Sequence, residues 1–238
     1  PPRSTLFPYT TLFRSWNSLS GRTQNMLENL RSAAENGLRH GACGFLITDW
    51  GDGGHWQPLG VSLGAFAYGA CLSWCYAAHF GVDLAAVADA QLTEGFGPVL
   101  LALGDVYRLC GAQRGNGTEL FQILSKPASR PMLPGVTEAT LRGALARVEE
   151  LAAGLRTSGS VLEQEAIHVA RLLRAACRRG IAILCGGLGE PGTRRALAEE
   201  MDALIAEHAR VWRLRNREGG LSDSSARLAR IREEYGCL

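Results

Sequence analysis

The sequence predicts an α/β fold, with strand–helix units of a barrel or doubly wound sheet in its first part and a helical region after them. Three observations predict it. A helical pattern over residues 25–40 leads into a short apolar run, Gly44 to Ile47, and that run ends in a cluster of polar and aromatic residues at 48–58. From residue 83 onward almost every segment has helical periodicity. A buried strand ending in a polar loop is typical of a site at the C-terminal end of a barrel strand.

The first fifteen residues do not fit the rest of the chain. They lack an initiator Met and repeat Thr-Leu-Phe at 5–7 and 11–13. They have neither the basic region nor the apolar core of a signal peptide. We expect residues 1–15 to be a non-native leader resembling a translated sequencing adapter, with native sequence from Trp16 onward. A disordered natural N-terminus is the alternative.

Composition is that of a globular protein and excludes several classes of partner. Of 238 residues, 46% are hydrophobic and 20% charged, and the net charge of +2 argues against nucleic acid. The sequence contains no apolar run of about 18 residues, so no membrane span is predicted. Seven cysteines without C-x-x-C spacing indicate free thiols and favour a reducing compartment such as the cytoplasm. The oligomeric state stays open.

In the first part, residues 25–40 form an amphipathic helix that Gly41 can end. The strand at 44–49 follows. The next strand is expected at about 70–74, although its small residues also suit a buried helix running to His79. The second part is expected to be a bundle of amphipathic helices joined by short turns. These helices are expected at 84–94, 97–110, 137–155, 161–185, 193–216 and 222–235, with a connector at 125–136.

Candidate site residues are concentrated in the cluster after the strand. Indoles beside a carboxylate suit a sugar, because apolar ring faces lie on aromatic side chains while hydroxyls bond to acids. The candidate sugar contacts are Asp49, Trp50, His55, Trp56 and, from the following segment, Trp74.

Each candidate has an alternative interpretation. Asp52 is expected only to shape the glycine turn, and Asp49 to have a site role. Two acids and one histidine are a weak metal pattern, so no metal or other cofactor is predicted. Trp50 and Trp56 are both candidates for core packing, with one expected to face a ligand, and Trp74 suits packing as well as a sugar platform.

Several stretches together resemble the C-terminal part of bacterial glycoside hydrolase family 20, the β-N-acetylhexosaminidases. Asp49 to Pro58 is the most specific of them. The others are Trp16-Asn17-Ser18, Gly21 to Asn25, Ala67 to Trp74, Glu207-His208 to Trp212, Arg215-Asn216-Arg217 and Gly219-Gly220-Leu221.

The resemblance implies a (β/α)₈ barrel whose last two strands are 44–49 and about 70–74, so that residues 16–82 complete a barrel and 83–238 form a helical extension. Family members hydrolyse terminal N-acetylhexosamine from glycosides with retention, using the substrate's acetamido oxygen as nucleophile. Their catalytic Asp-Glu pair lies upstream, and no adjacent Asp-Glu occurs in residues 16–238. The chain is therefore expected to be an inactive fragment of a glycoside hydrolase.

By analogy with the family, Trp74 stacks against the sugar. Asp49 and Trp50 occupy the positions of a family Tyr and Asp, and Tyr76 replaces a family acid. We therefore expect hydroxyl recognition to shift to Asp49 and His55. The alternative function is a non-catalytic carbohydrate-binding or helical scaffold module.

Overall fold

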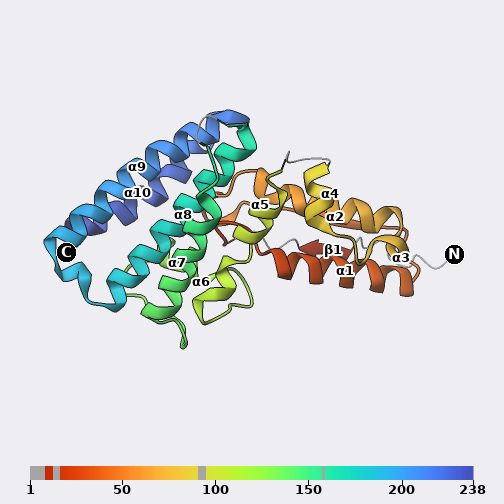
Figure 1. Cartoon of the computed structure of the whole chain (residues 1–238), viewed down its shortest axis with the longest axis horizontal. Coiled ribbons are helices and arrows are strands. Elements are labelled where there is room, and N and C mark those ends of the chain that lie inside the picture. The colour runs from red at the N-terminus through yellow and green to blue at the C-terminus, as the bar shows by residue number, and fades with distance from the viewer. Residues whose placement is uncertain (1–8, 13–16, 91–94, 157–158, 238) are drawn as a thin grey trace.

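The structure, a computed structural model, describes residues 9–12, 17–90, 95–156 and 159–237, apart from the side chains of 9–12, 52 and 237. It is elongated, with an N-terminal lobe (residues 17–90) at one end and a helical bundle (residues 97–237) at the other (Figure 1). The elements are β1 (Tyr9–Leu12), α1 (Thr23–Arg39), β2 (Phe45–Thr48), η1 (Asp52–Gly54), α2 (Gly60–Trp74), α3 (Tyr76–His79), α4 (Leu84–Ala88), α5 (Gly97–Leu103), η3 (Val106–Cys110), α6 (Glu119–Ser125), α7 (Glu138–Ala152), α8 (Val161–Leu184), η4 (Gly187–Gly189), α9 (Pro191–Arg215) and α10 (Leu221–Cys237).

The predicted barrel fragment is wrong. The structure is 69% helical, and the strands of its described residues are β1 and β2, a parallel pair in which Tyr9 lies opposite Phe45. The strand at 44–49 is present as β2, but the strand expected at about 70–74 is the last turn of α2. Residues 62–74 contain no β-branched side chain, so local propensity favours the helix.

Gly69 lets this helix lie close to β2. A Cβ atom at Gly69 would stand 1.9 Å from the Ile47 Cδ1 atom, a distance that no real contact allows. Strand and helix therefore pack directly against each other, but the pair is not continued into a barrel within the described residues.

The prediction of a mostly helical second part is confirmed. The predicted helices at 137–155, 161–185, 193–216 and 222–235 correspond to α7, α8, α9 and α10 within a few residues at each end. The stretch predicted at 97–110 is divided into α5 and η3, and α4 covers the described start of 84–94, whose residues 91–94 lie outside the described part. The sequence analysis missed α6, which Thr118 caps by accepting from the Phe121 amide.

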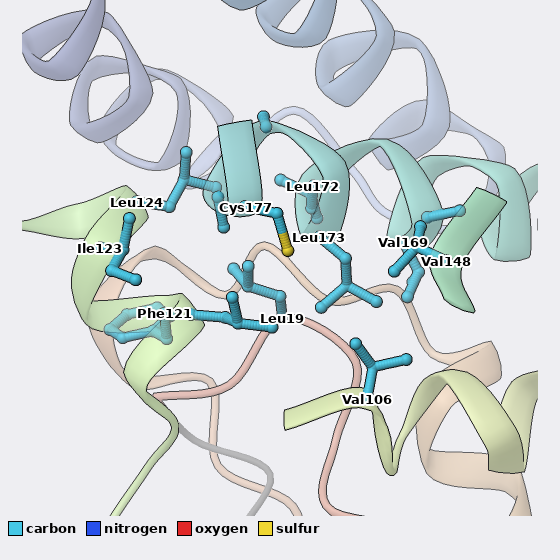
Figure 2. Close-up of a cluster of buried hydrophobic side chains, with 14 of the residues drawn as sticks. Leu19, Val106, Phe121, Ile123, Leu124, Val148, Val169, Leu172, Leu173 and Cys177 are labelled. Atoms are coloured by element: carbon cyan, nitrogen blue, oxygen red, sulfur yellow. The ribbon is translucent and has the colours of Figure 1, made fainter. Parts of the chain in front are cut away.

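The core of the bundle lies around α8. Side chains from α6, α7 and η3 meet one face of it, and Leu19 reaches this cluster from the N-terminal lobe (Figure 2). In the described part of the chain, 29 buried hydrophobic residues join this cluster. The fully buried members include Leu120, Leu124, Leu172 and Leu173.

The N-terminal lobe has a small core of its own. Seven buried hydrophobic residues of α1, α2 and α4 form it within the described residues, among them Leu30, Tyr68 and Leu72. Its surface carries most of the exposed large hydrophobic side chains. Of ten exposed large hydrophobic side chains in the described part, seven belong to this lobe: Leu38, Leu46, Trp50, Leu59, Phe66, Trp74 and Phe80.

Candidate functional site

The loop from Asp49 to Pro58 follows β2 and runs against the bundle. Its Trp56 is only 2% exposed and belongs to the core of the bundle. The indole lies 5.4 Å from the Phe121 ring, centroid to centroid. Its Nε1 donates to the Ser224 carbonyl oxygen at 3.1 Å. Trp56 thus anchors the loop, and its burial leaves no ring face for a sugar.

A second anchor is a buried chain of hydrogen bonds, the histidine–serine chain (His168, His208 and Ser224). The Ser224 hydroxyl donates to the Gly54 carbonyl in the loop. His208 Nε2 lies 2.8 Å from that hydroxyl, and His168 Nε2 lies 3.2 Å from His208 Nδ1. Because the serine proton goes to Gly54, His208 donates from Nε2 and accepts at Nδ1 from His168, an arrangement that requires a neutral His208.

Burial holds both imidazoles neutral. Desolvation lowers the pKa of His208 to about 4, and the neighbouring His55 contributes. Desolvation also lowers the pKa of His168 well below its usual value, with further contributions from His208, Arg171 and Arg210. A charged His208 would carry a proton on Nδ1 and could no longer accept from His168, so the loop is held most firmly at neutral pH.

A serine hydroxyl beside a histidine is also the pair of groups that a nucleophile and its base would use, but here the serine donates to Gly54 and the imidazole donates to the serine, so His208 is not placed to take the serine proton. In addition, Ser224 and His208 are each only 2% exposed. A substrate therefore has no access to this serine. We assign the histidine–serine chain to the fixing of the loop.

His55 lies at the edge of the loop. Its ring packs edge-to-face against Trp212 of α9, with 6.3 Å between centroids. Trp212 also contacts His208 at 5.8 Å and donates from Nε1 to the Arg217 carbonyl at 2.7 Å. His55 has a left-handed backbone, φ +50°, which turns the chain back over Gly51. Half-buried His55 therefore joins the loop surface to α9.

Asp49 and Trp50 lie at the other end of the loop. The Asp49 carboxylate accepts a hydrogen bond from the Ser62 hydroxyl in the first turn of α2. Trp50 is 49% exposed. Of the predicted sugar contacts, Asp49, Trp50 and His55 are thus on one loop and accessible in whole or in part, whereas the side chain of Asp52 lies outside the described part of the structure.

Trp74 is not part of this group. It is 87% exposed and ends α2. Asp49 contacts Ser62, near the start of the same helix. Ser62 and Trp74 are twelve residues apart on α2, which is about 18 Å along the helix axis. The prediction that Trp74 faces the same sugar depended on a strand at 70–74, and the helix found there removes that support.

The sequence analysis missed the residues that hold the loop. Ser224 was not considered, and His208 appeared only in the stripe of a predicted helix and in the family resemblance. The sequence separation between the loop and Ser224 is about 170 residues, so no local pattern reveals it. Two histidines on the inner faces of neighbouring helices were the one available signal.

Among the described residues, no group of three His, Cys, Asp or Glu side chains is placed to hold a metal ion. No helix in that part of the chain is long and apolar enough to cross a membrane.

Comparisons with known proteins add no assignment. No protein-family model matches the chain, and no curated protein sequence matches it. The resemblance to glycoside hydrolase family 20 therefore stays a prediction.

Proposed function

We propose that the chain is a non-catalytic glycan-recognition part of a β-N-acetylhexosaminidase-type protein, which binds N-acetylhexosamine-containing glycosides at the surface of the Asp49–Pro58 loop. The observation that carries the proposal is the difference between the two ends of that loop, one of which is fixed to the bundle while the other lies at the surface. Trp56 and Gly54 are fixed to the bundle, while Trp50 and Asp49 remain at the surface.

This arrangement suits recognition of a neutral sugar. Trp50 offers an apolar ring face for stacking, and the Asp49 and His55 side chains offer polar partners for hydroxyl groups. A loop fixed before binding loses little conformational freedom when a ligand is bound, which favours affinity. The resemblance of Asp49 to Pro58 to the hexosaminidases supports N-acetylhexosamine as the sugar. The proposal contains no catalytic step and no barrel.

The test is a titration of the chain with N-acetylglucosamine and its β-1,4-linked dimer, followed by tryptophan fluorescence and by amide chemical shifts. We expect saturable binding that the Trp50→Ala variant reduces by about tenfold or more, the usual weight of a stacking aromatic contact. Trp74→Ala is the control, because it removes another exposed indole, at the end of α2 that lies about 18 Å from the Asp49 contact at Ser62. Equal binding by both variants, or no saturation, contradicts the proposal.

A helical scaffold module is the second candidate. It is favoured by the seven large hydrophobic side chains that are exposed on the N-terminal lobe. Exposed hydrophobic side chains that gather on one surface mark sites of contact with other polypeptides.

The scaffold candidate predicts self-association or capture of an apolar protein surface. Sedimentation of the chain at rising concentration tests it. We expect Leu46→Ser with Phe66→Ser to shift the chain toward monomer, whereas Leu109→Ser with Leu214→Ser, on the bundle, leaves sedimentation unchanged. A chain that is monomeric at every concentration, before and after substitution, counts against this candidate.

A further inference from the structure

A separate cavity lies on the side of the loop that faces α6 and α10. Its volume is about 330 Å³, within the range of small-molecule sites. The loop contributes Gly53 and the edge of Trp56. The other lining residues are Asn17, Phe121, Gln122, Ser125, Lys126, Arg227 and Arg230.

The charge at this cavity is one-sided. Its lining contains Lys126, Arg227 and Arg230 but no Asp or Glu. None of these three side chains forms an ion pair with a described residue. Most of the other arginines that the structure describes do form one. Arg227 and Arg230 are three residues apart on α10, so both project from the same face of that helix. Three uncompensated positive charges at one concave site attract an anion.

The wall also holds a polar atom without a protein partner. The Ser125 Oγ atom is buried and has no hydrogen-bond partner among the described residues. A buried hydroxyl in that state loses hydrogen-bonding free energy unless a ligand or water supplies a partner. Asn17 and Gln122 add amide groups beside it. The cavity therefore presents hydroxyl and amide groups together with its cations.

Two glycines, Gly53 and Gly54, form the part of the loop that lies against the cavity lining. Gly53 has φ +75°, and a Cβ atom there would stand 2.7 Å from Phe121 Cζ and 3.1 Å from Asn17 Oδ1. At Gly54, a Cβ atom would stand 2.9 Å from Arg227 Cδ. Any larger residue at these two positions would displace the lining groups. The glycines thus let the loop pack closely against the residues that line the cavity.

We propose that this cavity binds a small organic oxyanion, a phosphate or carboxylate carried on a polar body of about monosaccharide size. The guanidinium groups of Arg227 and Arg230 and the ammonium group of Lys126 bind the oxyanion. The Ser125 hydroxyl and the Asn17 and Gln122 amides bind the polar body. The site is distinct from the sugar surface at Asp49 and Trp50 and does not depend on it.

The composition of the chain gives this site a direct assay. Lys126 is the only lysine among 238 residues, so amine-specific acetylation can modify only Lys126 and the chain N-terminus. The full chain is acetylated in the presence of inorganic phosphate, glucose 6-phosphate, glucuronate or neutral glucose. Mass spectrometry of the peptide that contains Lys126 gives the rate of modification.

We expect glucose 6-phosphate or glucuronate to slow acetylation of Lys126 in a saturable way, with weaker protection at high salt. Glucose is expected to give no protection, and the N-terminal amine reports any general effect on the reagent. Protection by glucose 6-phosphate alone identifies a phosphate site, and protection by glucuronate alone a carboxylate site. Equal protection by inorganic phosphate shows that the anionic group alone is recognised and overturns the part of the proposal that concerns the polar body.

Variants inside and outside the cavity test whether anion binding requires this site or only the positive charge of the protein surface. Arg227→Gln with Arg230→Gln is expected to weaken calorimetrically measured binding by about tenfold or more, because each charge-assisted hydrogen bond is among the stronger contacts in proteins. Arg195→Gln, an exposed arginine of α9 outside the cavity, is the matched control and should bind as the parent chain does. Unfolding temperatures establish that all variants are folded. If no anion binds saturably, or if both sets of variants weaken binding equally, the proposal is wrong.

Discussion

The helical bundle and the N-terminal lobe differ in how completely they bury their apolar residues. Within the described residues, 29 buried hydrophobic residues form the cluster of the bundle and seven form that of the lobe. Exposed large hydrophobic side chains show the reverse distribution, since seven of ten lie on the lobe. The bundle is therefore stable through its own core, whereas the lobe depends on what packs against it.

The two regions are joined at the loop that the sequence analysis predicted as a sugar site. Leu19 and Trp56 belong by sequence to the lobe but are buried in the cluster of the bundle. The histidine–serine chain holds Gly54 from the other side. The loop predicted to bind a ligand thus has one part that is fixed to the bundle, Gly54 and Trp56, and another part at the surface, Asp49 and Trp50.

The largest expected effect distinguishes a buried tryptophan, Trp56, from an exposed one, Trp74. Trp56→Ala should lower the free energy of unfolding by about 3–5 kcal/mol, because it leaves a cavity in the bundle core and removes the bond to Ser224. Trp74→Ala should change it by about 0.5 kcal/mol or less, since that side chain is exposed. Urea unfolding followed by circular dichroism measures both. Similar losses for the two variants would contradict the assignment of Trp56 to the bundle.

The next effect is on pH dependence. The pKa of His208 is lowered to about 4 in the folded chain, so below about 6.5 the unfolded chain binds a proton that the folded chain does not. Stability is therefore complete above about pH 6.5 and falls as the pH drops toward 4, by roughly 3 kcal/mol for this residue alone. Urea unfolding at a series of pH values measures the slope. His208→Gln should flatten it, and an unchanged slope in that variant would show that other groups cause the loss.

The smallest effect compares helix caps in the two regions. Thr118 accepts from the Phe121 amide at the start of α6, and Asp83 accepts from the Ala85 and Ala86 amides at the start of α4. Replacing either by Ala should cost about 1 kcal/mol. Thr118→Ala should lower the unfolding midpoint of the whole chain. Asp83→Ala should instead increase amide exchange mainly in the lobe, because this cap lies at the surface of α4 and outside the bundle core. A global loss in both variants would mean that lobe and bundle unfold as one unit.

How far the sequence predicts this structure depends on the range of the interactions. Amphipathic periodicity placed α7 to α10 within a few residues, because their stripes face a core close by. The apolar segment at 60–74 defeated the same approach. Its side chains are mostly apolar on every side, so a strand and a buried helix could be separated only by the lack of β-branched residues over 62–74.

The candidate site was predictable only where it depends on chemistry within the loop. The exposure of Trp50 and the polar partner of Asp49 agree with a surface role. The burial of Trp56 was not predictable, because it is fixed by Phe121 and by Ser224, far along the chain. The oxyanion cavity was missed for the same reason, since its cations come from α10 and from the residue after α6.

The distance in sequence between Gly54 and Ser224 also has a consequence for biosynthesis. The two residues are 170 positions apart. At about 5–20 residues per second, the ribosome needs roughly 10–30 s to make that stretch. During this interval the loop lacks its anchor and Trp56 lacks its pocket. The nascent chain thus presents an indole and an apolar lobe to chaperones until its last helix emerges.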